Sequence, residues 1–124
     1  MNHKRPVNLD LGSLKFPPMA IASILHRISG VILFLLMPLM LYILKLSLSS
    51  PESFDQLQVW LQCFYLKLLL IAFTAALVYH LLAGIRHICM DFGIGEELSS
   101  SRTSSIIVII LAGILTILLG IWIW

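Results

Sequence analysis

The chain has 124 residues, of which 60% are hydrophobic and 11% are charged, and its mean hydropathy is +1.02. A soluble domain carries about 25% charged residues, so these few charges are not enough to cover the surface of a compact soluble fold. The formal net charge of +2 does not indicate a nucleic-acid partner either, and we expect a protein whose main solvent is lipid.

Residues 1–18 are expected to form a cytoplasmic amino-terminal segment that lies on the membrane surface or against a partner protein. Apolar and polar residues alternate from Pro6 to Leu11, and the pair Pro17-Pro18 ends this segment and starts the first helix. The apolar run that follows is too long for the core of a cleavable signal peptide, so none is expected.

Residues 19–124 are predicted to form an all-α transmembrane domain of three helices. Three long apolar runs support this, namely Met19–Leu44 with an interruption at His26-Arg27, Leu68–Ile85 and Ile106–Trp124. A membrane-spanning helix needs about 20 apolar residues, each of which adds about 1.5 Å. With their flanks, the runs predict spans at 19–48, 59–90 and 104–124. Turn-forming residues predict loops at Ser47–Phe54 and Asp91–Thr103.

The cationic residues are distributed unevenly over the two sides of this arrangement. Six fall on the side of the amino terminus, namely Lys4, Arg5, Lys15, Arg27, Arg86 and Arg102, whereas only Lys45 and Lys67 fall on the other. Lys and Arg in short loops tend to stay in the cytoplasm. We therefore expect the amino terminus and the Asp91–Thr103 loop to be cytoplasmic.

The two cysteines, Cys63 and Cys89, are expected at opposite ends of the second span. The 26 helical residues between them correspond to about 39 Å, so the two thiols cannot form a disulfide with each other.

His80 is the one histidine inside the second apolar run. A polar group in lipid is costly and usually faces protein or a cavity. His80 is therefore either a neutral histidine bonded to a neighbouring helix or a metal or haem ligand. His87 lies two turns further on the same helix face, so both rings cannot bind opposite sides of one iron. His26 is expected to lie several residues too shallow, which favours a second histidine from another subunit.

Ser23 and Arg27 share one helix face at the start of the first span, and His26 lies one turn from Ser23. One interpretation is structural: Ser23 bonds its own helix, and His26 and Arg27 mark the headgroup boundary. The other is a polar pocket whose donors bind a quinone carbonyl or a propionate.

Arg86, His87 and Asp91 are expected at the same membrane face as Arg27, where the second span ends. Pairing of a carboxylate with an arginine would explain part of this cluster without any functional role.

Two stretches carry a more specific pattern. A Ser-x-x-His-Arg motif opens the first span at Ser23–Arg27, and a His-x-x-x-Gly-x-Arg-His-x-x-x-Asp motif closes the second at His80–Asp91. Together with Arg5–Leu11, these stretches closely resemble the cytochrome b membrane-anchor subunit of succinate dehydrogenase, respiratory complex II. The resemblance covers essentially the whole chain, and every motif position is matched.

The resemblance implies roles for the matched residues. His80 would be an axial ligand of haem b, and therefore a ligand of the haem iron, with the second axial histidine supplied by a partner anchor subunit. His26 and Arg27 would lie near the haem propionates. Ser23 and Arg27 would bind ubiquinone as the substrate.

The resemblance also implies partners and a location. These are a second membrane-anchor subunit, an iron–sulfur subunit and a flavoprotein subunit in a membrane, with electrons passing from succinate to quinone. The short amino terminus, which is unlike a transit peptide, adds the expectation of a bacterial cytoplasmic (inner) membrane. His87 and Asp91 would lie near the quinone site without an assigned role. The chain alone would catalyse nothing complete, because it lacks flavin motifs and the cysteine clusters that bind iron–sulfur centres.

Three other interpretations remain. The chain could be a haem-free structural anchor of a soluble oxidoreductase, with His80 as a packing residue, or the anchor of a fumarate reductase. A small transporter is disfavoured, because no span is broken by Gly or Pro at mid-membrane and no inverted repeat is visible.

Overall fold

The computed structural model describes residues 16–124, and this part of the chain consists of four helices. They are α1 (Pro18–Ser49), α2 (Pro51–Trp60), α3 (Phe64–Asp91) and α4 (Leu98–Ile123). Three of them, α1, α3 and α4, are long and apolar enough to cross a membrane, which confirms the predicted all-α fold with three long apolar helices. Residues 1–15, which make up most of the predicted surface segment, lie outside the described residues.

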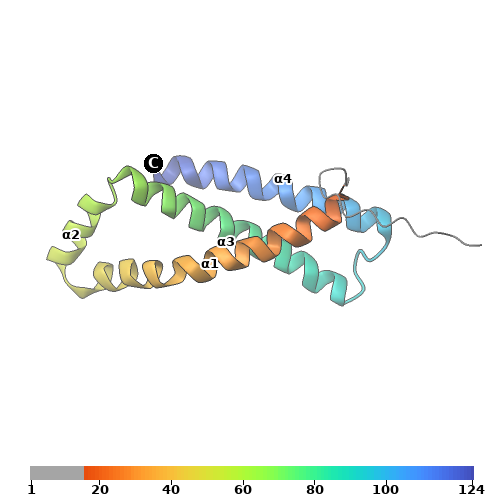
Figure 1. Ribbon diagram of the computed structural model, residues 1–124, viewed down its shortest axis with the longest axis horizontal. Helices are drawn as coiled ribbons and strands as arrows, with labels where there is room; N and C mark the ends of the chain where they lie inside the picture. Colours follow the sequence, from red (N-terminus) through yellow and green to blue (C-terminus); the bar gives the residue numbers. More distant parts are fainter. Residues whose placement is uncertain (1–15) are drawn as a thin grey trace, which may run out of the picture.

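The three long helices lie side by side, and α3 packs against both α1 and α4 (Figure 1). In the figure α3 crosses α1 and runs in the opposite direction to α4. One end of the bundle is where α1 begins, α3 ends and α4 begins, and we call it the histidine end. The other is the α2 end, because the short helix α2 joins α1 to α3 there.

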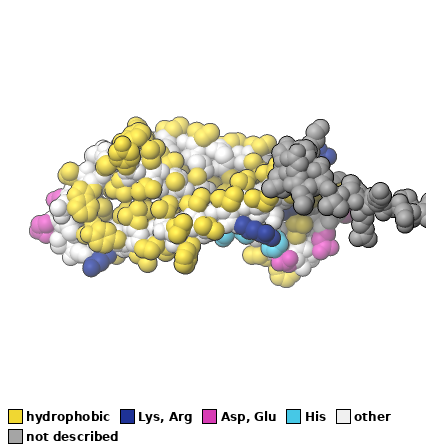
Figure 2. Space-filling view, in the orientation of Figure 1, with side chains coloured by type: hydrophobic (Ala, Val, Ile, Leu, Met, Phe, Trp, Pro, Cys, Tyr) yellow, Lys and Arg dark blue, Asp and Glu magenta, His cyan; other side chains and the backbone are white. Residues whose placement is uncertain are grey.

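Small side chains form the contacts between the long helices. Ala22 of α1, Ala76 and Ala83 of α3, and Ala112 of α4 are all buried. Such residues let helix backbones approach closely in a membrane. Large apolar side chains face outward, and charged side chains gather towards the two ends of the molecule (Figure 2). This distribution fits a bundle that is surrounded by lipid along its length.

The segment Ser47–Phe54, predicted to be a loop, is helical except at Ser50, so this prediction is wrong. The Ser50 hydroxyl accepts a hydrogen bond from the Ser53 backbone N–H (3.1 Å), and the Ser53 hydroxyl accepts one from the Ser50 backbone N–H (3.0 Å). This reciprocal pair caps α2. Pro51 suits the first position of α2, because the N–H that proline lacks would have no acceptor within the helix there. Residues that favour turns therefore form a corner between two helices.

The loop predicted at Asp91–Thr103 is shorter than expected, because α4 already begins at Leu98. The end of α3 is closed by two bonds of 2.9 Å, from the Gly93 N–H to the Met90 carbonyl and from the Ile94 N–H to the Cys89 carbonyl. Gly93 has a φ of 80°, which such a helix end requires and which glycine adopts without strain. The serine-rich residues after Leu98 continue the helix.

The second long helix begins at Phe64 and not at residue 59, because residues 61–63 leave the helical path after α2. Which parts of the three long helices lie within the membrane stays a prediction.

Candidate functional site

A small polar cavity lies between α1 and α3 at the histidine end. Its volume is about 170 Å³, and its lining residues are Ala22, Ser23, His26, Arg27, Ala83, Arg86 and His87. The two alanines are buried, which brings the helices together, and the other five residues supply hydroxyl, imidazole and guanidinium groups around the space. Ser23, His26 and Arg27, which were predicted to form a polar pocket, thus line one cavity.

His80 lies directly beside this cavity, in contact with His26. The centroids of the two imidazole rings are 4.3 Å apart and their planes are inclined by 27°. The prediction that His26 lies several residues shallower than His80 is therefore wrong. It assumed that depth can be counted along each helix separately, whereas α1 and α3 cross (Figure 1). The contact between the two rings places them at the same level. Rings stacked in this way leave no space for a flat ligand between them.

One nitrogen of His80 is held by α1. His80 Nδ1 lies 3.0 Å from the Ser29 hydroxyl and 3.2 Å from the backbone carbonyl oxygen of His26. Ser29 is buried, and its hydroxyl donates to the same His26 carbonyl at 2.7 Å. Gly30 makes room for the ring, because a Cβ at this position would lie only 3.2 Å from His80 Cε1. A larger residue there would push the imidazole aside.

His26 has an unused polar atom. Among the described residues, its Nε2 is the one buried side-chain nitrogen or oxygen without a hydrogen-bond partner. Such an atom loses its bonds to water and gains nothing in return, which costs about 1 to 3 kcal/mol. Gly84 borders this nitrogen, since a Cβ there would lie 3.8 Å from it. The site therefore contains a buried nitrogen whose hydrogen-bonding capacity is unused.

Arg86 joins the cavity to α4. Its Nε donates to the Ser104 hydroxyl at 2.9 Å, and its Nη2 donates to the hydroxyl and the carbonyl oxygen of Ser101 at 2.9 and 3.1 Å. Arg86 belongs to the cluster that carboxylate–arginine pairing would explain in part, and it is bonded to serines instead. Asp91 is exposed and is not among the residues that line the cavity. The structure brings His87 into the cavity, but not Asp91.

We expect the serine contacts of Arg86 to stabilise the fold. Replacing both Ser101 and Ser104 by Ala removes two of the three hydrogen bonds found for the partly buried Arg86 guanidinium group, which should lower the free energy of unfolding by about 1.5 to 3 kcal/mol. Thermal unfolding of the purified complex in detergent measures this. The matched control replaces Ser99 and Ser100, which are exposed on the same helix. Equal effects of the two double substitutions would contradict the prediction.

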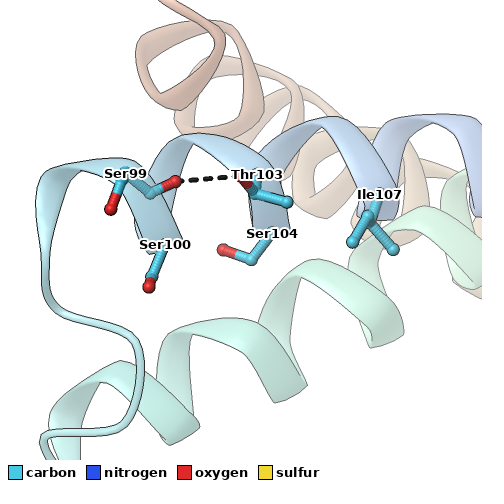
Figure 3. A pocket seen from close by; sticks show the side chains of 5 residues that line it. All are labelled: Ser99, Ser100, Thr103, Ser104 and Ile107. Carbon is cyan, nitrogen blue, oxygen red and sulfur yellow. Dashed lines mark hydrogen bonds between the residues drawn. The ribbon is translucent and has the colours of Figure 1, made fainter.

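Two of the larger hollows illustrate that the others have fewer polar groups that a ligand could use. One, of about 340 Å³ on α4, is lined by Ser99, Ser100, Thr103, Ser104 and Ile107 (Figure 3). Its Thr103 hydroxyl donates to the Ser99 carbonyl of its own helix (3.0 Å). The other, of about 620 Å³, is a largely apolar groove between the three long helices. Neither contains Ser23, His26, Arg27 or His80.

Three contacts at this site were not predicted from the sequence. They are the hydrogen bond between Ser29 and His80, the 2.7 Å bond from the Tyr79 hydroxyl to the Ala22 carbonyl, and the bonds from Arg86 to α4. Ser29 and Arg86 both lie in or next to the two motifs, which was the one available signal. Nothing in the spacing shows which helix each side chain faces.

The arrangement allows two kinds of chemistry. His80 keeps Nε2 for a ligand bond, because the hydrogen bonds found among the described residues use Nδ1. An imidazole of this kind is a common ligand of iron. Ser23 and Arg27 supply donors that can bind and stabilise an oxygen on which negative charge develops.

Comparison with known proteins gives a consistent result over nearly the whole chain. A family model described as succinate dehydrogenase/fumarate reductase transmembrane subunit matches residues 1–119. The succinate dehydrogenase cytochrome b556 subunit of Coxiella burnetii (strain RSA 493 / Nine Mile phase I) is 50% identical and covers 100% of both chains. The subunit of the same name from Rickettsia typhi is 34% identical, over 94% of this chain and 91% of the relative. The succinate dehydrogenase cytochrome b560 subunit of Marchantia polymorpha is 33% identical, over 95% and 90%.

Proposed function

The chain belongs to the succinate dehydrogenase/fumarate reductase transmembrane subunit family, and from this premise we propose that it is the cytochrome b subunit that anchors a succinate dehydrogenase in the membrane. The observation that carries the proposal is that Ser23, His26 and Arg27 line one cavity and that His80 lies against His26. A reduced-minus-oxidised absorption spectrum of the purified complex tests the cytochrome assignment. A b-type haem signal is expected.

The residues around His80 fit a haem. His80 would bind the iron, and Gly30 keeps the space that its ring needs. The unpartnered His26 Nε2, together with Arg27, offers donors to propionate groups. When bound, haem supplies a one-electron centre whose potential depends on its axial ligands. His26 and His80 are stacked, so they cannot bind opposite faces of one iron, and this supports a second axial histidine from a partner anchor subunit.

Ser23 and Arg27 would bind the quinone. The Ser23 hydroxyl would donate to one carbonyl oxygen of ubiquinone. Arg27 would stabilise the negative charge that develops on the quinone oxygens as electrons arrive. Reduction to the quinol takes up two electrons and two protons, and the protons would enter from the cytoplasm at the histidine end. His87 lines the same cavity and would be part of the quinone site, whereas Asp91 does not line the cavity.

The electrons must reach this chain from other subunits. An iron–sulfur cluster needs several cysteine ligands, and the chain has two cysteines, which lie at opposite ends of α3. An iron–sulfur subunit and a flavoprotein subunit that oxidises succinate would therefore complete the complex. The broad apolar surface outside the helix contacts is available to lipid and to the partner anchor.

A haem-free anchor is the second candidate. The observation that favours it is that His80 Nδ1 already has partners within the chain, as expected for a histidine that only packs two helices. The absence of haem from the purified complex would support this candidate. A fumarate reductase anchor would use the same residues, because the two reactions differ in the direction of electron flow.

The two native cysteines can test the proposed orientation in a bacterial inner membrane. Cys63 is exposed and precedes α3 at the α2 end, and Cys89 lies in the last turn of α3 at the histidine end. With a cytoplasmic amino terminus, a membrane-impermeant maleimide added to intact spheroplasts should label Cys63 but not Cys89.

Single-cysteine variants, Cys63→Ser and Cys89→Ser, identify the labelled site by mass spectrometry. Labelling of Cys89 from outside would reverse the proposed orientation.

A further inference from the structure

An imidazole that binds iron through one nitrogen has a second nitrogen whose surroundings influence the metal. A hydrogen-bond acceptor at this second nitrogen orients the ring, selects the tautomer and makes the ligand more basic. For His80, the residue in question is Ser29, to which neither the sequence motifs nor the proposed function assigns a role.

The hydrogen bonds of Ser29 determine the tautomer of His80. The single hydroxyl proton of Ser29 is donated to the His26 carbonyl, at 2.7 Å. The Ser29 oxygen can therefore only accept from His80 Nδ1, which lies 3.0 Å away. The other neighbour of Nδ1, the His26 carbonyl at 3.2 Å, is also an acceptor. Because both neighbours accept, Nδ1 must carry the proton, and the lone pair of the ring lies on Nε2.

Burial of Ser29 and stacking of His26 on His80 favour a stable hydrogen bond between Ser29 and His80. Ser29 has 4% of its surface exposed, so water does not compete for its hydroxyl. His26 stacks on the face of the His80 ring, whereas a bond from Nε2 to a metal lies in the plane of the ring. The stacking thus limits rotation of His80 without blocking Nε2.

We propose that Ser29 is a positioning residue for His80: by accepting the Nδ1 proton it presents Nε2 to the haem iron and lowers the reduction potential of the haem. The inference rests on the proposed function, in which His80 binds the iron. A more basic imidazole stabilises ferric iron relative to ferrous iron, so weakening the bond at Nδ1 should raise the potential.

The test uses the purified complex with Ser29→Ala. The substitution leaves the longer contact to the His26 carbonyl as the acceptor for Nδ1. At a fixed ambient potential we expect the ratio of ferrous to ferric haem to rise about threefold, which corresponds to about 28 mV at 59 mV per tenfold for one electron. Potentiometric titration of the haem absorption measures this, and the electron paramagnetic resonance g values should shift with it.

Ser47→Ala is the matched control, because the Ser47 hydroxyl also donates to a carbonyl three residues earlier in α1, at 2.8 Å, but contacts no histidine. Its potential should equal that of the wild type. If Ser29→Ala does not retain haem, Ser29→Cys takes its place, since a thiol is a weaker acceptor and should raise the potential in the same direction.

The outcomes distinguish failure of the cytochrome assignment from failure of the proposed role of Ser29. A wild-type complex without haem would overturn both the cytochrome assignment and the role of Ser29. A wild-type complex with haem whose potential and g values do not change in the Ser29 variant would overturn the role of Ser29 alone. A raised potential in the Ser29 variant and an unchanged one in Ser47→Ala would support it.

Discussion

Replacing His80 by Leu is expected to abolish the low-spin b-type spectrum of the purified complex. Leucine has about the same bulk but no nitrogen that can bind iron, so the haem would lose one of its two axial ligands. Either the haem content falls several-fold, or the remaining haem becomes high-spin. Reduced-minus-oxidised absorption spectra of the wild type and the variant, scaled to the protein content of the complex, measure both effects.

His87→Leu is the control for this experiment, because it removes an imidazole two turns away on the same helix. His87 is exposed and lines the cavity, but it is not one of the partners of His80 in the hydrogen bonds described. Its complex should keep the low-spin spectrum. If His80→Leu keeps the wild-type spectrum, His80 is a packing residue, and the iron ligand must be sought elsewhere.

Replacing Ser23 by Ala is expected to lower quinone reduction while succinate oxidation continues. The hydroxyl would donate to a quinone oxygen that gains negative charge, and loss of one such donor costs about tenfold to hundredfold in rate. Succinate oxidation with a water-soluble artificial acceptor should stay near the wild-type rate, because the flavin lies in another subunit. Parallel assays with ubiquinone and with the artificial acceptor give the ratio.

The Ser47→Ala variant again serves as the control, because it removes a hydroxyl from the exposed surface of the same helix, far from the cavity. Both of its activities should match the wild type. Equal loss of the two activities in Ser23→Ala would indicate a damaged assembly. No loss of either would show that Ser23 does not contribute to the quinone site.

His80 and His26 show where reasoning from the sequence alone stopped. The motif placed both residues near one membrane face, but their depths were counted from the ends of separate apolar runs. A helix rises only about 1.5 Å per residue, so a modest tilt or shift between two helices changes the relative level of two side chains by a full turn. The contact between the rings depends on the crossing of α1 and α3, which no single run encodes.

Arg86 is a second example. Its position beside His87 and near Asp91 suggested pairing with a carboxylate, yet its donors bond Ser101 and Ser104 of α4. Ser101 had been predicted to lie in a loop, because serine is common in turns, whereas Ser104 was the first residue of the predicted third span. In the folded chain the Ser104 hydroxyl donates to the Ser101 carbonyl, and the hydroxyls of both serines accept from Arg86, while the segment is helical from Leu98.

The order of residues along the chain was enough to predict the three long apolar helices, the unequal distribution of cations over the two sides and, through two motifs, the family. The helices can be predicted from neighbouring residues, because the length of an apolar run and the cost of unpaired backbone groups in lipid depend only on that segment. The tertiary structure alone decided that His26 stacks on His80, that Ser29 accepts from its Nδ1 and that Arg86 binds α4. Such contacts depend on the rotation of each helix and on the angle at which it crosses the next. Close packing of Ala22, Ala83 and Ala112 sets this geometry, and the length of an apolar run does not.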